Sequence, residues 1–366
     1  MKNLFEQILS KKQIIKNKDN QSVNIDSIIL KDAGQIFSHF YKEDSLHEMR
    51  SISKILIGLA YGISLDRRML TLDTLVYPIL KNIVNIKNLN NIEKIKKWKI
   101  KHLLTYSCGY ESQMFSERFI KDINPANYLE YIVNFDLVYE PGEKYTYNNA
   151  DIFLLSVCFH EMFNKNIKDF IDEEIFAPLN IQNFKWENFG KYCPGGTGLY
   201  ISHKDLFKIG ELILNKGKYN NKQIISTKYI EEMCSTQIET PYAIKADRVL
   251  PKIGVGYIMH ISRDGYIYKD GTNGQYLIIN LKKQQPKLKV WGKAMIILTK
   301  LNNVPFSLNP DFIETIEETP DTTIKLITKN VIIVKEPMQE VLDKIYKYRA
   351  IAGGSRTNVI PNIGDL

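Results

Sequence analysis

Ser51 and Lys54 have the residue types and the spacing of a nucleophile and its base. They begin the segment SISKILIGLAYGISL (51–65), which is almost continuously apolar after Lys54 and predicts a buried helix. Residues three apart share a helix face, so the hydroxyl and the amine should lie within hydrogen-bond reach. Burial disfavours the ammonium form, and a neutral amine can accept or relay the serine proton. The pair predicts nucleophilic catalysis, and a serine cap followed by a surface lysine is the alternative.

Tyr147 and Asn149 form a second candidate group, between a Pro-Gly turn and an expected helix. A tyrosine near lysines can hold a phenolate or pass a proton, and an asparagine can bond both a substrate amide and the lysine. The Y-x-N pattern recurs at Tyr219, but there it lies in the polar stretch KGKYNNKQ, which is typical of a surface loop. The placement favours Tyr147 for proton transfer and Asn149 for substrate contact.

A third candidate group closes the expected strand YIYKDG, where Lys269 and Asp270 precede GTNGQYLIIN. The glycines permit close approach of a substrate along the strand edge. We expect Lys269 to face the serine helix and Gly271 to lie beside the substrate. The Thr272 N–H would join the serine N–H in an oxyanion hole. Side chains alternate along a strand, so Asp270 should point to the opposite face.

Other kinds of chemistry have weaker signals in this sequence. The six histidines show no i, i+4 pairing with a carboxylate and no cysteine partners, so we predict no metal site. The loop PGGTG lacks the lysine of a phosphate loop, and no G-x-S-x-G is present for a Ser-His-Asp triad. The four cysteines lack a CxxC pair and are expected to be reduced thiols.

Composition restricts the class of protein further. The 366 residues are 44% hydrophobic and 25% charged, which excludes disordered and collagen-like chains. The net charge of +8 is concentrated between Lys81 and Lys101, and a solvated lysine face explains it better than a nucleic-acid site. No apolar run is long enough for a membrane span, and residues 1–18 lack the features of a signal peptide. We therefore expect a cytoplasmic protein with no nucleic-acid partner and leave its oligomeric state open.

The elements that must position these groups follow the order strands, helices, strands. Residues 23–42 predict a hairpin that turns at Gly34. Helical patterns follow at 70–80, 92–106, 150–163, 167–176, 202–216 and 226–235. Strand patterns follow at 254–262, 265–271, 274–283, 291–301 and 324–334, and a last helix at 337–349. A sheet built from both ends of the chain, with a helical insertion, satisfies this order.

The three groups occur in the order S-x-x-K, Y-x-N, K-x-G, which resembles the serine β-lactamase and penicillin-binding-protein superfamily on its class C β-lactamase side. The resemblance extends over LHEMRSISK (46–54), KHLLTYSCGY (101–110), PGEKYTYNNADIFLLS (141–156) and the segment 195–226. It covers roughly residues 23–300. GTNGQYL is similar to the branch that includes 6-aminohexanoate-dimer hydrolase and related esterases.

The resemblance implies a β-lactamase-like fold of the α/β (α+β) class, in which helices flank an antiparallel sheet and an all-helical lobe is inserted. The expected hydrolase domain spans residues 1–302, with the sheet from about 20–45 and 250–302 and the helical lobe at about 66–200. Residues 303–366 would be a C-terminal extension of unknown role.

The resemblance also implies acyl transfer through a serine ester, without a metal or an organic cofactor. The catalytic residues would be the nucleophile Ser51, its activating partner Lys54 and the general base and acid Tyr147. The substrate-binding residues would be Asn149, Lys269, Gly271 and Thr272. We expect hydrolysis of a small ester, amide or peptide. The alternatives are acyl transfer to an amine, as in peptide tailoring or cyclisation, and a non-catalytic binding protein that retains the fold.

Asp270 departs from the family pattern, in which a small or hydroxyl residue is usual at this position. Its carboxylate beside the binding edge should disfavour acidic substrates. Together with the lack of an export signal, this weakens the case for a β-lactamase activity.

Overall fold

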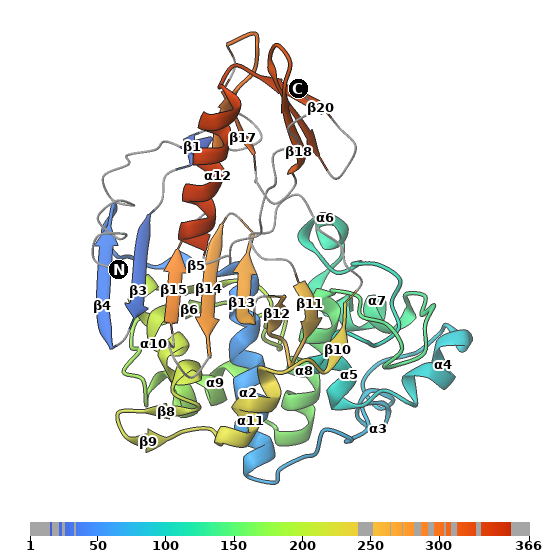
Figure 1. The fold of residues 1–366 in the computed structure, drawn as a ribbon. Helices are drawn as coiled ribbons and strands as arrows, with labels where there is room; N and C mark the ends of the chain where they lie inside the picture. Colours follow the sequence, from blue (N-terminus) through green and yellow to red (C-terminus); the bar gives the residue numbers. More distant parts are fainter. Residues whose placement is uncertain are drawn as a thin grey trace.

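An eight-stranded antiparallel sheet forms the centre of the computed structural model, in the order β10-β11-β12-β13-β14-β15-β3-β4 (Figure 1). The structure describes residues 15–16, 22–23, 26–240 without 33, and 252–352 without 264, 273, 282–286, 292–295, 304, 309–312 and 327–330. The N-terminal strand β3 (Ser27–Asp32) pairs with β15 (Lys287–Trp291) from the other end of the chain. The predicted sheet from both chain ends is therefore confirmed.

The remaining strands of this sheet follow the predictions closely. β4 (Gln35–Phe40) and β3 form the expected hairpin, with Gly34 at φ +83° in its turn. The expected strand at 254–262 is divided into two, because the chain turns at Ile258, which has φ +70°. Before this turn lie β10 (Ile238–Glu239), which was not predicted, and β11 (Lys252–Val255). After it come β12 (His260–Ser262), β13 (Tyr266–Gly271) and β14 (Gln275–Asn280).

The strand expected at 291–301 was wrong in its placement. The sheet strand is β15, which lies earlier, and β16 (Ile296–Thr299) pairs with β17 (Pro305–Leu308) outside the large sheet. Residues 292–295, between the two strands, lie outside the described residues.

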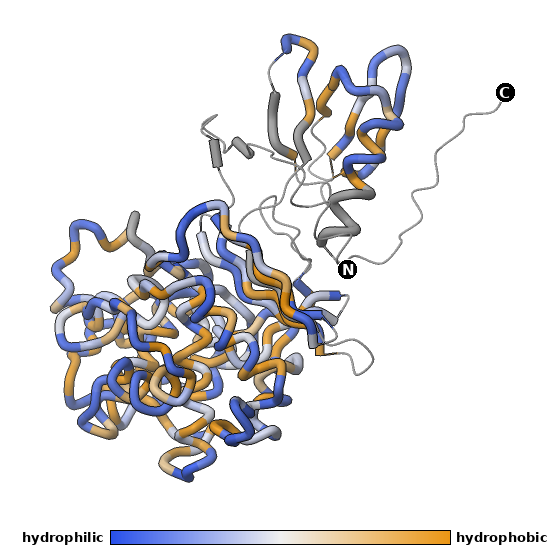
Figure 2. The backbone as a smooth tube through the Cα atoms, turned by 90° about the vertical axis from the view of Figure 1, so that its left-hand side faces the viewer, coloured by the Kyte–Doolittle hydropathy of each residue, from blue (hydrophilic) through white to orange (hydrophobic). Residues whose placement is uncertain are grey.

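Most of the helices pack on one side of the sheet, as the side view in Figure 2 shows. A 3₁₀ turn, η1 (Arg50–Ser53), leads into α2 (Lys54–Asp66), whose side chains are buried from Lys54 to Ser64. The helical lobe contains α3 (Tyr77–Leu80), α4 (Leu89–Ile95), α5 (Ile100–Leu104), α6 (Glu117–Ile120), η2 (Pro125–Asn127), α7 (Tyr128–Asn134) and α8 (Asn149–Phe163). After it come α9 (Ile167–Ile171), the π-helical turn η3 (Asp172–Phe176), α10 (His203–Leu214) and α11 (Thr227–Met233).

Two helix predictions in the lobe were wrong for one shared reason. Only the last turn of 70–80 is helical, and 92–106 is broken into α4 and α5 around Trp98. Between these helices, Val76 N donates to Trp98 O and Ile100 N donates to Thr74 O. This backbone pairing replaces the helical bonds of both segments. The helices predicted at 150–163, 167–176, 202–216 and 226–235 are confirmed, the last two with the serine caps Ser202 and Ser226.

The two faces of the large sheet pack into two different hydrophobic cores. Ile29 and Leu277 on one face join the large core made with the helices. Their strand neighbours Ile28 and Ile278 join a second core with residues of the C-terminal segment, such as Ile324. This segment contains β16, β17, β18 (Ile313–Glu318), β19 (Thr322–Leu326), β20 (Val331–Val334) and α12 (Met338–Ala352).

The expected strand at 324–334 is thus a hairpin of β19 and β20, and the expected last helix is α12. The hairpin of β16 and β17 crosses residue 302, where the sequence placed a domain boundary. The division into a 1–302 domain and a 303–366 extension stays a prediction.

Short strands complete the described structure. One small sheet contains β5 (His47–Glu48), β7 (Leu199–Ile201) and β6 (Lys185–Trp186). Two further pairs are β1 (Ile15–Lys16) with β2 (Ser22–Val23) and β8 (Lys218–Tyr219) with β9 (Lys222–Gln223). Within the part of the chain that the structure describes, no helix combines the length and the apolar character needed to cross a membrane.

Gly62 lets α11 pack directly on α2, and its replacement tests this contact. A Cβ at Gly62 would lie 2.3 Å from the Tyr229 ring, whose hydroxyl donates to Gly58 O at 2.6 Å. We predict that Gly62→Ala destabilises the protein by about 1–3 kcal/mol, because overpacking outweighs the better helix propensity of alanine. Urea unfolding measures the change, and in a Tyr229→Ala background the same substitution should cost much less. A more stable Gly62→Ala protein would contradict this packing argument.

Candidate active site

Ser51 lies in the 3₁₀ turn η1, just before α2, and not on the α-helix itself. The turn is held by the β5–β7 pairing upstream and by Met49 N, which donates to Leu199 O at 2.8 Å. Arg50, directly before the serine, has φ +48°, a conformation that side chains other than glycine seldom adopt. Lys54 Nζ donates to Ser51 Oγ at 2.8 Å. The predicted contact between the two groups is therefore present.

The Lys54 amine is fully buried against a glycine loop. Its side chain is 0% exposed, and Nζ also donates to Gly196 O at 3.0 Å. A Cβ at Gly196 would lie only 3.0 Å from Nζ, so a side chain there would crowd the lysine. Burial lowers the pKa of Lys54 well below its usual value. The nearby charge of Lys269 lowers it further, and Asp270 partly offsets this effect.

Tyr147 reaches the same serine from the loop before α8. Its hydroxyl donates to Ser51 Oγ at 2.7 Å, and Lys54 Nζ lies 5.3 Å from its ring centroid. The competing tyrosine, Tyr219, ends β8 and is followed by two asparagines with positive φ in a turn. The fold thus brings Tyr147 to the serine and puts Tyr219 in a short hairpin strand, next to a surface turn.

Asn149 begins α8 next to the lysine and the glycine loop. A Cβ at Gly196 would lie 3.4 Å from Asn149 Oδ1. This oxygen is buried and has no hydrogen-bond partner among the described residues. The expected bond between Asn149 and Lys54 is therefore not made in this structure. The neighbouring Asn148 caps α8 through its side chain, which accepts from Ala150 N at 3.1 Å.

Lys269 lies on the core face of β13 and is 0% exposed. Its Nζ donates to Tyr106 OH at 3.1 Å and to Ile258 O at 3.0 Å, and it lies 3.2 Å from His260 Nε2. It also lies 5.2 Å from the Tyr147 ring centroid. Lys269 therefore faces the candidate site as predicted, but the contacts of its ammonium are with the protein. A direct contact with substrate stays a prediction.

The His260 ring lies close to both Lys269 and Asp270, with one ring nitrogen near each side chain. Lys269 pairs across the sheet with Leu277 and Asp270 with Tyr276, which belong to opposite cores, so the predicted alternation of the two side chains is confirmed. Asp270 Oδ1 lies 3.2 Å from His260 Nδ1, whereas Lys269 reaches the other nitrogen of the ring. Burial and the charge of Lys269 hold the pKa of His260 well below its usual value.

Gly271 brings the end of β13 against the turn that carries the serine. A Cβ at Gly271 would lie 2.8 Å from Met49 O and 3.2 Å from the Arg50 side chain. This glycine therefore permits close approach of the protein's own backbone, and its contact with substrate stays a prediction. Thr272 follows at an exposed position near the same turn. Its part in an oxyanion hole stays a prediction.

Sequence reasoning missed three groups of this site: Tyr106, Gly196 and His260. Tyr106 and Gly196 lie within segments that resemble the superfamily, but nothing in those segments marked them as partners of the lysines. His260 has neither a carboxylate at helical spacing nor a cysteine partner in the sequence. Its signal lay in strand register, because a hairpin between β12 and β13 pairs His260 with Tyr268, the neighbour of Lys269.

Comparison with known families now identifies the chain. Residues 28–314 match the family model for beta-lactamase, so the chain belongs to the beta-lactamase family. This match indicates a hydrolase of the β-lactamase and penicillin-binding-protein superfamily. A second model, for flagellar and swarming motility proteins, matches residues 295–352. No curated protein sequence matches the chain significantly.

Solved structures show the same fold. A Bacteroides dorei DSM 17855 protein assigned as a β-lactamase aligns with TM-score 0.63 and 17% identity, over 83% of this chain and 93% of its own. A Bacillus anthracis protein assigned as a 6-aminohexanoate-dimer hydrolase aligns with TM-score 0.58 and 18% identity, over 73% of this chain and 74% of its own. A D-stereospecific amidohydrolase from Streptomyces sp. aligns with TM-score 0.58 and 12% identity, over 79% and 91%. These similarities confirm the predicted β-lactamase-like fold.

The two charges next to Lys54 should move its titration in opposite directions. The rate at which a fluorophosphonate labels Ser51 should fall at low pH as the amine is protonated. Lys269→Met removes a charge that lowers the pKa of Lys54, so the midpoint of this pH profile should move to higher pH. Asp270→Asn removes a charge that raises this pKa, so the midpoint should move to lower pH.

Lys144→Met serves as the control, because Lys144 is exposed and its ammonium bonds Tyr139 OH. It should leave the midpoint where it is. If Lys269→Met and Asp270→Asn moved the midpoint in the same direction, or not at all, the electrostatic assignment would be wrong.

Proposed function

We propose that the protein is a serine hydrolase that forms an acyl-enzyme on Ser51 and hydrolyses a small ester, amide or peptide. The observation that carries the proposal is the convergence of two groups on one serine oxygen. Lys54 Nζ lies 2.8 Å and Tyr147 OH 2.7 Å from Ser51 Oγ, although Tyr147 comes from a distant part of the chain. A hydroxyl flanked by a buried amine and a phenol has the arrangement of an activated nucleophile.

In the proposed reaction, Ser51 Oγ attacks the substrate carbonyl carbon and gives its proton to the Lys54–Tyr147 pair. The lowered pKa of Lys54 supports this step, because a neutral amine is the form that accepts a proton. The backbone N–H groups of Ser51 and Thr272 bind the oxyanion of the tetrahedral intermediate. Tyr147 then passes a proton to the leaving oxygen or nitrogen, and the acyl-enzyme remains.

Water completes the proposed cycle. It attacks the ester carbonyl and gives a proton to the Lys54–Tyr147 pair. The second tetrahedral intermediate then breaks its bond to Ser51 Oγ, which takes the proton back from the pair, and the acid is released. Lys269 and His260 act as positioning residues in this scheme. The Lys269 ammonium lies against the rings of Tyr106 and Tyr147, at 5.1 Å and 5.2 Å from their centroids, and thus fixes a positive charge beside the phenol.

Two features support a neutral substrate with an N–H or O–H donor. Asn149 Oδ1 is a buried acceptor without a partner among the described residues, and an unsatisfied buried oxygen favours a ligand that donates to it. Asp270 is partly exposed next to the binding edge, where its carboxylate disfavours acidic groups. A cytoplasmic location, which the sequence favours, is part of the same proposal.

The nucleophile is tested by Ser51→Ala. We predict that this variant loses covalent labelling by a fluorophosphonate and loses turnover of small esters, while its thermal unfolding changes little. Intact-protein and peptide mass spectrometry detect the label. Ser235→Ala, at an exposed serine of the same chain, is the matched control and should be labelled like the natural protein. Labelling of Ser51→Ala at the natural rate would exclude the proposed mechanism.

Proton transfer is tested by Tyr147→Phe, which keeps the ring and removes the hydroxyl. The rate constant for turnover should fall by roughly 10²–10⁴-fold with little change in KM, because the hydroxyl acts on the reacting proton and not on binding. Tyr219→Phe, in the second Y-x-N, should have almost no effect on kcat or KM. The reverse pattern would assign the role to Tyr219.

A further inference from the structure

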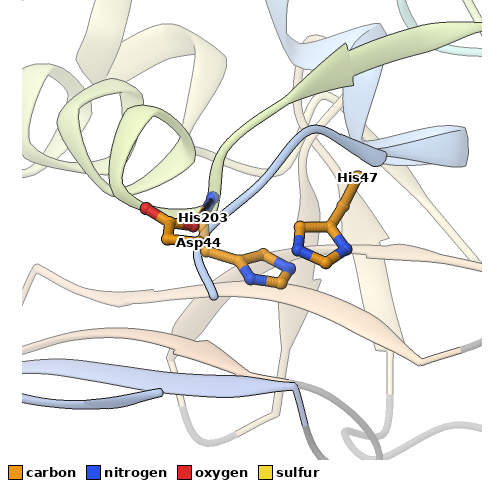
Figure 3. A group of neighbouring side chains, drawn as sticks. All are labelled: Asp44, His47 and His203. Atoms are coloured by element: carbon orange, nitrogen blue, oxygen red, sulfur yellow. Dashed lines mark hydrogen bonds between the residues drawn. The ribbon is translucent and has the colours of Figure 1, made fainter. Parts of the chain in front are cut away.

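Asp44, His47 and His203 form a cluster of metal-ligating side chains that does not include Ser51, Lys54 or Tyr147 (Figure 3). One ligand atom from each lies within 4.8 Å of the others, and all three residues are partly buried. The two histidines come from distant parts of the chain, so no sequence spacing reveals the cluster. His47 begins β5, which leads to the nucleophile turn, and His203 begins α10.

One nitrogen of each histidine already has a neighbour. His203 Nδ1 lies 2.8 Å from Ser27 Oγ, and His47 Nδ1 lies 3.9 Å from Asp26 Oδ2. This leaves the two Nε2 atoms for a ligand, and Figure 3 shows the two rings side by side next to Asp44. Metal-bound histidines usually have such an outer partner on the other ring nitrogen, which fixes the tautomer.

His47 Nε2 is the atom that the rest of the described structure does not explain. It is buried and has no hydrogen-bond partner there. The two rings are stacked, with centroids 4.2 Å apart and an interplanar angle of 14°. Coordination therefore requires a rotation of the His47 ring, and this rotation breaks no hydrogen bond of Nε2. The ligand atoms must also approach to roughly 3.3 Å of one another, the spacing set by zinc–nitrogen bonds of about 2.0–2.1 Å.

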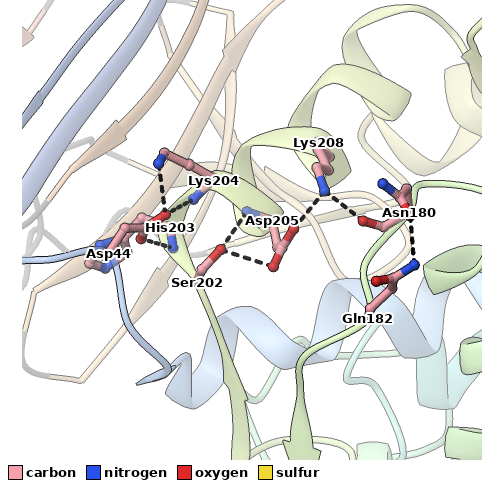
Figure 4. Close-up of polar contacts among 8 residues, drawn as sticks. All are labelled: Asp44, Asn180, Gln182, Ser202, His203, Lys204, Asp205 and Lys208. Atoms are coloured by element: carbon pink, nitrogen blue, oxygen red, sulfur yellow. Dashed lines mark hydrogen bonds and ion pairs between the residues drawn. The ribbon is translucent and has the colours of Figure 1, made fainter.

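Asp44 supplies the third ligand from a fixed position. Its carboxylate accepts from His203 N at 2.9 Å and from Lys204 N at 3.4 Å, which leaves further lone pairs on both oxygens. Figure 4 shows how the start of α10 is held: Ser202 Oγ bonds Asp205, and Lys208 Nζ donates to Asn180 O. Lys204 Nζ, 4.0 Å from Asp44, is exposed and can move away from an incoming cation.

We propose that Asp44, His47 and His203 bind one Zn²⁺ ion, which joins the strand before the nucleophile turn to the start of α10. Two imidazole nitrogens and one carboxylate are a donor set that suits zinc, with water as the fourth ligand. The site holds structure together and takes no part in the reaction at Ser51.

Isothermal titration of the EDTA-treated full chain with ZnCl₂ tests the site. The natural protein should bind one Zn²⁺ per chain, and its melting temperature should rise with added zinc. His47→Gln and His203→Gln should each weaken binding at least tenfold. His39→Gln, at a histidine of β4 outside the cluster, should bind like the natural protein. Absence of saturable binding, or equal binding by His47→Gln, would overturn the proposal.

Two further variants distinguish loss of zinc binding from loss of folding and from loss of activity. Asp44→Asn retains an oxygen for the bonds from α10 but removes the charge, so it should fold normally and bind zinc more weakly. Equal zinc affinity in a folded Asp44→Asn protein would remove Asp44 from the site.

Ser51→Ala should bind zinc like the natural protein, so failure of the hydrolase proposal and failure of the zinc proposal can be told apart. Bound Co²⁺ should show the visible absorption of a tetrahedral site, and its loss in His203→Gln is the spectroscopic check.

Discussion

The contact between a fully buried lysine and a serine hydroxyl is the interaction on which the rest of this site depends. An ammonium without water is costly, so Lys54 needs acceptors at short range and a lowered pKa. Ser51 Oγ and Gly196 O supply those acceptors. A side chain at Gly196 would crowd the amine, so the position of this lysine favours a glycine in the loop beside it.

A second buried lysine, Lys269, also lies close to the Tyr147 ring, and Asp270, the next residue of β13, partly offsets its charge. Lys269 and Asp270 point to opposite faces, yet His260 connects them, with one ring nitrogen near each. Asp270 thus lies near enough to oppose the effect of Lys269 on Lys54. An aspartate in the K-x-G position is therefore an electrostatic element of the site.

Glu48 links the turn η1, which carries Ser51, to the loop that follows Gly196. Its Oε2 pairs with Arg50 Nε at 2.9 Å, and its Oε1 accepts from Thr197 Oγ1 at 3.1 Å and Gly198 N at 3.2 Å. The unusual backbone angle of Arg50 is thereby held in place by its own side chain. On the far face of the sheet, the C-terminal segment closes the second core, which accounts for burial of the outward-facing residues of β3 and β14.

The sequence by itself determined the superfamily, the contact between Ser51 and Lys54 and most of the elements. Local information is sufficient for these, because S-x-x-K spacing, Ser202 and Ser226 caps and strand alternation all act within a few residues. The residues around the two Y-x-N patterns also favoured Tyr147 over Tyr219 as the tyrosine near the serine. Only the tertiary structure decided the partners of Lys269, the break in the helices around Trp98 and the meeting of His47 with His203. Each of these depends on contacts between segments far apart in the chain, and spacing along the sequence carries no information about such distances.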